Sequence, residues 1–505
     1  MAAGPPSSPP VGAGAHMHRW AVILLAVAAA SCAPARMDSA PADSLDTIES
    51  ELAADVAVLA SDGFEGRRPG TDGEAKTLRY LAQRWQAAGL ESGTNDPANP
   101  WFAPVALQLI TPEHFEAAFF RGRRKLAPPD GSVRLYTSGR RSLLERSPAV
   151  FVGRRGGSLD QAELAGRIAV MLWDHPRKVE QREALLEKGA AAVLAIVPDA
   201  AELAELTDLR SKGSYRLASA EDGAQLDGLV SREGAEALLG AERFATLSAA
   251  AGREGFRPVP LDIEARLEAT SLSREVRTHN LIARLPGRLP NAGAVLLLAH
   301  WDHFGHCAEG QGPDAICNGA VDNASGLAVL GAVAKRLAQG PQLDRDVYFV
   351  ATTAEEWGLL GARAFAQDPP MPLDTIVAAF NVDTVAVAPR GGPVAIVGHG
   401  MTALDGEVER ITASLDRKLG DHDYANRYVR RQDGWALLQH DVPALMVSSA
   451  FADREAMEAY MRDRYHRTGD IPEAMQFGGA AEDVLLHLAL VRHFASLGGY
   501  QAAQP

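Results

Sequence analysis

The sequence has no excess of positive charge and only three cysteines among its 505 residues. Lys and Arg number 50 against 64 Asp and Glu, a formal net charge of -14, so a phosphate backbone is not favoured and we exclude nucleic acid as a partner. Hydrophobic residues at 47% and charged residues at 23% indicate a globular protein. The length predicts two or three domains.

The sequence also has too short an apolar run near its N-terminus for a membrane-spanning helix. The run "WAVILLAVAAA" is about half of the roughly 20 residues needed. It follows His18 and Arg19 and precedes small residues ending at Cys32, which predicts a signal peptide over 1–32 and export to a bacterial periplasm, or secretion. The "AASC" ending at Cys32 resembles a lipobox, although Ala29 replaces the usual Leu; a lipidated Cys32 would anchor an outer-membrane lipoprotein, and plain cleavage would release a free product.

The two remaining cysteines, Cys307 and Cys317, lie ten residues apart. In an exported protein this spacing favours a disulfide, because the compartment is oxidising. The alternative, a thiolate metal site, needs more ligands nearby than the two cysteines supply.

The pattern of apolar and polar residues changes twice along the chain. Residues 45–125 begin with two segments of helical periodicity, "ELAADVAVLA" and "GEAKTLRYLAQRWQAAGL". Residues 126–272 contain short strand-like pieces such as "RIAVMLW" and "AAVLAIV" between polar connectors, which indicates an inserted accessory domain.

From residue 273 to 500 the pattern alternates strand and helix. The runs "AVLLLAH", "VYFVATTA", "TIVAAFNVD" and "PALMVSSA" are apolar almost throughout and have the length of strands. They predict an α/β fold with a doubly wound, mostly parallel sheet that is buried on both faces. In such sheets ligands bind beyond the carboxyl ends of the strands.

Polar residues occur at those strand ends. Two histidines and several acidic residues converging there would form a charge cluster that needs divalent cations as compensation. Imidazole and carboxylate ligands suit zinc, and two ions could share a water. One glutamate of an adjacent pair could then bind metal while its neighbour acts as base; the alternative is that both merely favour a helix N-terminus. The residues are His300, Asp302, Asp322, Glu355, Glu356, Asp383 and His466.

The motifs "AHWDHFG", "NGAVDNASG", "TAEEWGLLGA", "FNVDTV" and "YHRTGDI" resemble those of the co-catalytic zinc exopeptidase family that includes aminopeptidase Y, aminopeptidase S and plasma glutamate carboxypeptidase. "LASDGFEGRRPGT" near the start is also similar. The resemblance covers about 45–500 and implies a zinc exopeptidase fold, with 126–272 as a β-rich protease-associated (PA) insert between catalytic parts 45–125 and 273–500.

The resemblance further implies a role for each site residue. Two Zn²⁺ ions, replaceable by Co²⁺ or Mn²⁺, would be bridged by Asp322, and Glu355 would be the general base. Asp302 would orient His300. A Cys307–Cys317 disulfide would brace the loop before Asp322. The ligands of one ion would be completed by His300 and Asp383, and those of the other by Glu356 and His466.

The expected function is hydrolysis of the N-terminal residue of peptide substrates. Carboxypeptidase or dipeptidase activity on the same scaffold is the nearest alternative, followed by a glutaminyl-cyclase-like acyltransferase and a non-catalytic binding protein. The insert would be either a lid beside the cleft or a passive scaffold. The sequence leaves open the preferred side chain, the native metal and the oligomeric state.

Overall fold

The computed structural model describes residues 44–154, 161–173, 178–220, 225–253, 255–307 and 315–501. All of them belong to the second of the chain's two compact units, which begins at Ser44. The predicted signal peptide and Cys32 lie outside the described residues. Among the described helices, none combines the length and the apolar character needed to cross a bilayer.

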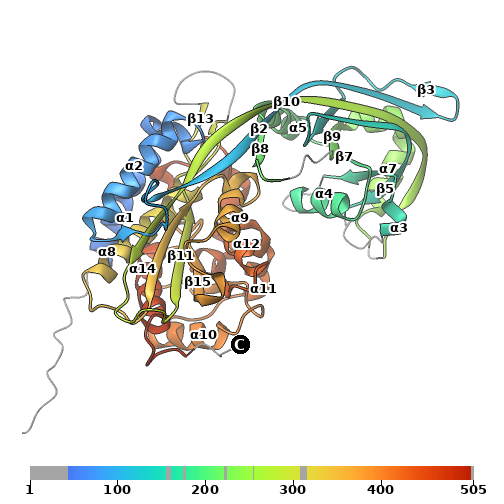
Figure 1. Ribbon diagram of the computed structural model, residues 1–505. Helices are drawn as coiled ribbons and strands as arrows, with labels where there is room; N and C mark the ends of the chain where they lie inside the picture. The colour runs from blue at the N-terminus through green and yellow to red at the C-terminus, as the bar shows by residue number, and fades with distance from the viewer. Residues whose placement is uncertain are drawn as a thin grey trace, which may run out of the picture. The chain divides into compact units, whose positions relative to one another are not determined.

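A mixed sheet organises the C-terminal half of the chain (Figure 1). Its strands follow the order β16-β17-β15-β11-β14-β10. The pairs β11·β14, β11·β15 and β15·β17 are parallel, whereas β10 and β16 are antiparallel to their neighbours. The predicted mostly parallel sheet is confirmed. The strands are β10 (Val259–Leu285), β11 (Ala294–His300), β14 (Asp346–Thr352), β15 (Ile376–Asn381), β16 (Ala395–Val397) and β17 (Ala444–Ser448).

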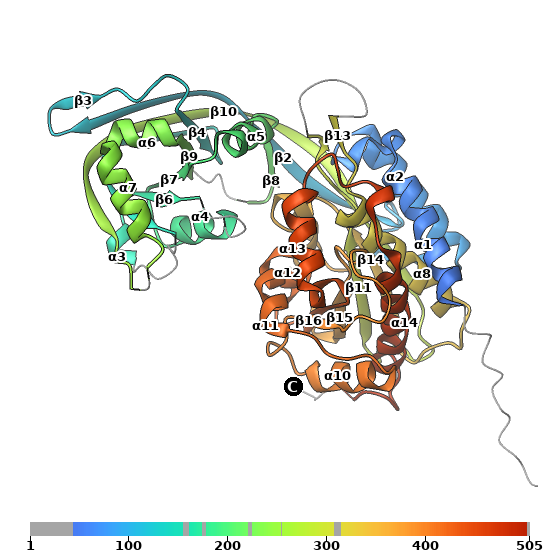
Figure 2. The same ribbon diagram turned by 180° about the vertical axis from the view of Figure 1, so that it is seen from behind.

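Helices cover both faces of this sheet, as the front and back views show (Figures 1 and 2). Alternate residues of β11 serve the two faces: Val295 and Leu297 pack with the first group of helices, and Leu296 and Leu298 with the second. This explains the continuous apolar run of the strand. The first group is α1 (Leu45–Leu59), α2 (Asp72–Ala87), α8 (Ser325–Ala338) and α14 (Phe477–Phe494), and the second is α9 (Leu360–Gln367) and α12 (Gly434–Leu438).

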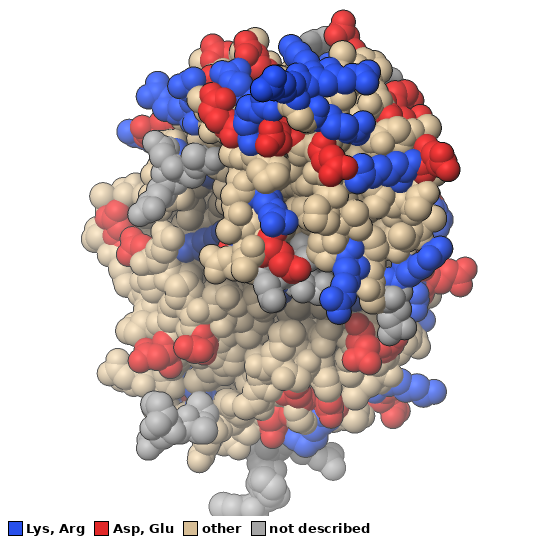
Figure 3. Space-filling view, turned by 90° about the vertical axis from the view of Figure 1, so that its right-hand side faces the viewer, with Lys and Arg blue, Asp and Glu red and all other residues tan. Residues whose placement is uncertain are grey.

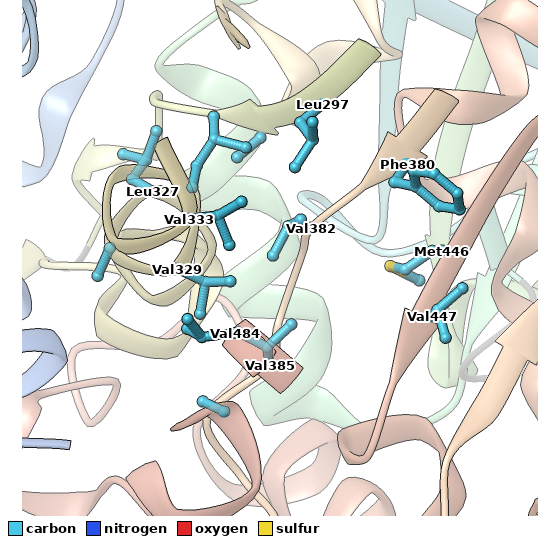
Figure 4. Close-up of a cluster of buried hydrophobic side chains, with 14 of the residues drawn as sticks. Leu297, Leu327, Val329, Val333, Phe380, Val382, Val385, Met446, Val447 and Val484 are labelled. Carbon is cyan, nitrogen blue, oxygen red and sulfur yellow. The ribbon is translucent and has the colours of Figure 1, made fainter. Parts of the chain in front are cut away.

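The core between the sheet and the first group of helices is fully buried (Figure 4). Leu297 of β11, Val329 and Val333 of α8, Phe380 of β15 and Val484 of α14 are 0% exposed. Burying a side chain of this kind contributes roughly 1.5–3 kcal/mol. The strand ends therefore project from a rigid, close-packed support.

Residues 126–272 continue the same sheet through β5-β6-β7-β9-β4. The two parts of the sheet are connected by the long strands β2 and β10, which pair with each other. Near its end β10 also pairs with β14, and over its earlier part it also pairs with β5. This segment has hydrophobic clusters of its own. That residues 126–272 form a separate inserted domain remains a prediction. The strands are β2 (Phe102–Arg121), β4 (Val133–Thr137), β5 (Arg141–Gly153), β6 (Ile168–Leu172), β7 (Ala192–Val197) and β9 (Leu226–Ser231).

Basic and acidic side chains are interspersed on the face shown in Figure 3, where Lys and Arg gather toward the top. On β10 the Arg266 guanidinium lies 3.2 Å from Glu116 and 3.3 Å from Glu145. Arg146 pairs with Glu264 at 2.8 Å. Much of the positive charge on these strands is therefore paired with carboxylates.

Candidate metal centre

The predicted site residues meet at one edge of the sheet, beyond the carboxyl ends of the parallel strands. His300 is the last residue of β11, and Asp383 follows β15 by two residues. Glu355 and Glu356 lie in the short turn η5 (Glu355–Trp357), just after β14. His466 follows helix α13 (Arg454–Asp463).

One group of potential ligands surrounds Nε2 of His300. This atom lies 3.1 Å from Oδ1 of Asp322 and 3.5 Å from Oδ1 of Asp383. All three residues are buried, and their ligand atoms are close enough to hold one ion.

A second group surrounds Nε2 of His466. This atom lies 2.9 Å from Oε2 of Glu356 and 3.3 Å from Oδ2 of Asp322. The two oxygens of the Asp322 carboxylate therefore face different histidines, which is the arrangement that a bridging ligand requires.

His303 also belongs to this cluster, although the sequence reading did not select it. It is 0% exposed, its Nδ1 contacts Oε1 of Glu356, and together with Asp322 and Glu356 it forms a possible metal-binding group. It lies in "AHWDHFG", three residues beyond the end of β11. Like His300 and Asp302, it lies just after the end of a strand, and this position is the signal in the sequence that indicates it.

The donor set fits divalent cations. Nε2 of His300, His303 and His466 are buried and have no hydrogen-bond partner among the described residues, although carboxylate oxygens lie nearby. Burial alone would lower the pKa of His300, but the charges of Glu355 and Asp383 raise it above its ordinary value. Zinc is bound by such imidazole nitrogens and carboxylates. His303 would contact the ligand Glu356. The ions themselves would be held by His300, Asp322, Asp383, Glu356 and His466.

Glu355 is placed differently from its neighbour. It is 9% exposed, and burial raises its pKa well above the ordinary value, with a further rise from the charges of Asp383 and Asp433. It lines a cavity together with Asp322, Asp383, Tyr428, Phe451 and Met461. A carboxylate with raised proton affinity beside the ligand cluster can act as a general base.

Asp302 supports the turn that carries the two glutamates. Its carboxylate accepts the N–H of Glu355 at 3.0 Å and that of Glu356 at 3.4 Å. The carboxylate is 3.8 Å from Nδ1 of His300, whereas the main-chain oxygen of Asp302 is 3.2 Å from this nitrogen. The expected contact with His300 is thus made more closely by the backbone, and the side chain holds η5.

The turn η4 (Ala320–Ala324), which carries Asp322, is held from two sides. The Asp470 carboxylate accepts the N–H of Val321 at 3.0 Å and that of Asp322 at 3.1 Å. Gly319 has φ 57°, and a Cβ at this position would lie 2.1 Å from the carbonyl oxygen of Asp322. Only glycine fits at this position.

Arg67, from "LASDGFEGRRPGT", is a buried cation behind the cluster. It is 0% exposed, and its guanidinium donates to the carbonyl oxygens of Leu59, Trp301, Asn318 and Gly319 at 2.5–2.9 Å. Burial lowers its pKa to about 10, a change opposed by the charges of nearby acidic residues such as Asp322. Arg67 therefore joins the end of α1, the end of β11 and the loop before η4.

Cys307 and Cys317 form a disulfide, as predicted. It closes the hairpin of β12 (Gly305–His306) and β13 (Ile316–Cys317). Sγ of Cys317 lies 3.5 Å from the carbonyl oxygen of His466. The disulfide thus lies beside a predicted ligand as well as before Asp322.

A separate group of possible ligands, His399, Glu409 and His422, lies away from this edge. The backbone N–H of Ile396 donates to Nδ1 of His422 at 3.1 Å. The neutral ring therefore carries its proton on Nε2, so neither nitrogen offers a lone pair to a cation without losing this bond.

Residues 280–488 match peptidase family M28. A 101-residue stretch is 34% identical to the vacuolar membrane protease of Candida dubliniensis; it is 20% of this chain and 10% of that protein, so the match spans a tenth of the relative's length. An aminopeptidase from Aneurinibacillus sp. strain AM-1 has a similar fold, with a TM-score of 0.56 and 16% sequence identity. The superposition covers 90% of this chain and 96% of that one. A zinc aminopeptidase from Bacillus subtilis has a TM-score of 0.50 and 15% sequence identity, and the superposition covers 90% of this chain and 97% of that one.

At these identities the solved structures establish the fold alone, and the family match covers the part of the chain that contains the strand-end motifs. The matched residues include β11, β14, β15 and β17 and every predicted ligand. Residues 280–488 are therefore similar to peptidase family M28, and the described part of the chain has the fold of the aminopeptidase from Aneurinibacillus sp. strain AM-1.

Proposed function

We propose that this protein is a two-zinc exopeptidase that removes the N-terminal residue of peptides. The observation that carries the proposal is the Asp322 carboxylate, whose two oxygens face His300 and His466 at 3.1 and 3.3 Å. This geometry suits two ions that share one carboxylate. Glu355 lies beside them and lines the adjoining cavity.

Bound zinc would lower the pKa of a water and stabilise the negative charge of the transition state. Glu355 accepts the proton of the attacking water and returns it to the leaving amine. Its raised proton affinity favours the first of these transfers. Asp302 keeps Glu355 in position through the two backbone N–H groups of η5.

The choice of the N-terminal residue is supported by two similar solved structures that are named aminopeptidases. The cavity beside Glu355 has an apolar part formed by Tyr428, Met446 and Phe451, which suits the side chain of a terminal residue. Carboxypeptidase or dipeptidase action would use the same ligands and base, and is the second candidate.

The test is hydrolysis of aminoacyl-anilides and their N-acetylated forms by the purified protein, with chelation and with restoration by Zn²⁺, Co²⁺ or Mn²⁺. We expect cleavage of the unblocked substrates only and its loss on chelation. Glu355→Gln should lower kcat by about 10²–10⁴-fold while both metals remain bound, since general-base catalysis is worth this much.

Glu356→Gln is the matched control, because the same change one residue later removes a predicted ligand. It should lower zinc content as well as activity. Cleavage of acetylated peptides from the carboxyl end would establish the second candidate, and full activity of Glu355→Gln would remove Glu355 from its role.

We also propose that the protein is exported. The Cys307–Cys317 disulfide is stable in an oxidising compartment, which agrees with the signal-like segment before Cys32. Mass spectrometry of the mature N-terminus tests this: a diacylglyceryl group on Cys32 indicates a lipoprotein, a free N-terminus nearby indicates plain cleavage, and an intact Met1 contradicts export.

A further inference from the structure

The turn that carries Glu355 and Glu356 is bordered by unfavourable backbone conformations. Ala354 and Leu359 have φ of 51° and 61°, and Gly358, between them, has φ 102°. Residues with a Cβ disfavour this region, and they keep it only where surrounding contacts hold the chain. The contacts of η5 therefore decide whether the predicted base and ligand stay in position.

Asp302 holds only the start of this turn. The end of the turn is Trp357, whose indole ring packs against two aromatic rings. The Tyr215 ring meets it edge-on at 4.7 Å, and the Phe304 ring lies 5.4 Å away. Phe304 in turn lies 4.5 Å from the ring of His466, so this aromatic cluster also reaches the ligand across the site.

Tyr215 comes from residues 126–272, far from the other members of the cluster in sequence. It lies in β8 (Ser214–Leu217), which pairs with β2, and it is 5% exposed. Its hydroxyl donates to the carbonyl oxygen of Pro69 at 2.8 Å and accepts from Nε of Arg68 at 3.2 Å. The ring is thus fixed at its hydroxyl end as well as at its contact with Trp357.

Arg68 joins the two rings. Its guanidinium lies 5.2 Å from the centre of the Trp357 ring and 5.3 Å from that of Tyr215. It also donates to the carbonyl oxygen of Lys212 at 3.1 Å, next to β8. A guanidinium over aromatic faces is attracted by their electron density, and the attraction is stronger out of water.

We propose that Tyr215 is a positioning residue for the catalytic turn. Through Trp357 it keeps Glu355 and Glu356 in place, so that residues 126–272 contribute to catalysis without touching the substrate. This inference rests on the proposed function for its effect on rate, whereas its effect on the turn itself is independent of any activity.

The experiment compares Tyr215→Ala with Tyr215→Phe in the full-length mature protein, by hydrogen exchange of residues 353–361 with and without zinc. Tyr215→Ala removes the ring and should speed amide exchange in this turn about tenfold or more, since exchange reports local opening. It should also lower kcat by about a hundredfold, the scale expected for a misplaced catalytic group, with a much smaller change in KM. Tyr215→Phe keeps the ring and should restore protection and most of kcat.

Tyr136→Ala is the control for a general weakening of the segment. Tyr136 is a buried tyrosine of β4 whose ring packs on Arg210 at 3.7 Å, within residues 126–272. The Tyr136→Ala variant should have a lower melting temperature, but its amide hydrogen exchange at residues 353–361 should be unchanged.

Unchanged exchange in Tyr215→Ala would overturn the inference, and so would equal effects of Tyr136→Ala on the turn. Absence of peptidase activity from the unaltered protein would instead reject the proposed function. The exchange measurement would still decide whether Tyr215 holds the turn.

Discussion

Glu355 and Glu356 are neighbours with opposite shifts in proton affinity. Burial raises the pKa of Glu355. Burial and Asp322 would also raise that of Glu356, but the charges of His466 and His303 lower it below its ordinary value. Two carboxylates whose environments separate their pKa values can take different roles at one pH. This difference is what the proposed base and ligand require.

His487 is a buried histidine that should make the stability of the fold sensitive to acid. It is 0% exposed in α14, with its ring 6.3 Å from that of Phe380, and burial lowers its pKa to about 4. The unfolded chain binds a proton near pH 6.5, so between pH 6.5 and 4 the unfolded state holds more protons and stability falls as the pH falls. When the pH falls from 7.5 to 5, this one residue should lower the free energy of unfolding by about 2 kcal/mol.

His487→Leu should therefore reduce the loss of unfolding free energy between pH 7.5 and 5 by about 2 kcal/mol. Urea denaturation of both proteins at the two pH values measures it, and groups common to both cancel in the difference. His440→Leu, at an exposed position, controls for the replacement itself. Equal losses in His487→Leu and the parent would contradict the assignment.

At the scale of the element, short turns and one hairpin form the site, while the long strands and helices support it. The β12·β13 hairpin lies between β11 and η4 in the chain, so its disulfide limits how far the loop before Asp322 can move. Cys317 also lies beside the carbonyl of His466. Loosening this hairpin should affect ligands on both sides of the cluster.

The double variant Cys307→Ser, Cys317→Ser should lose about 2–4 kcal/mol of stability, the usual effect of removing a disulfide. Its zinc occupancy should fall, because the hairpin and the loop before η4 become more mobile. Calorimetry and metal analysis measure the two effects, and reduced parent protein should behave like the variant. Unchanged melting temperature and zinc content in both would show that the hairpin holds its form without the bond.

At the scale of the whole molecule, the sheet edge concentrates acidic side chains that are buried at its rim. Asp302, Asp322 and Asp383 are 7% exposed or less. A buried carboxylate is costly unless it is paired or binds a metal. Metal binding should therefore stabilise the entire fold as well as enable catalysis.

Zinc should raise the melting temperature of chelated protein by about 3–6 °C at a hundredfold excess over Kd for two sites, from mass action. Scanning fluorimetry over a zinc series measures this rise. Asp322→Asn, which weakens the shared ligand, should abolish most of it, whereas the same change at an exposed position, Asp416→Asn, should not. A melting temperature independent of zinc would count against a metal centre here.

The sequence predicted the parallel strands, the disulfide and the residues that meet at the sheet edge. It did so because a strand buried on both faces has a continuous apolar run, and because the residues after such strands share one edge. His303 was missed although it obeys the same rule. Arg67 and Tyr215 could not be found in this way, since Arg67 contacts carbonyl groups as far as 252 residues away, and Tyr215 reaches Trp357 from another part of the chain.

The sequence alone thus indicates which side chains are available and at which strand ends they lie, because local apolar periodicity sets where each strand stops. How these side chains are oriented depends on contacts made in the folded protein. The two oxygens of Asp322 face two histidines because Asp470 and Gly319 hold its turn. Glu355 differs from Glu356 because burial and the charges of Asp383 and Asp433 raise the pKa of Glu355, whereas the charges of His466 and His303 lower that of Glu356. These contacts join residues distant in sequence, and their geometry depends on packing that no local pattern records.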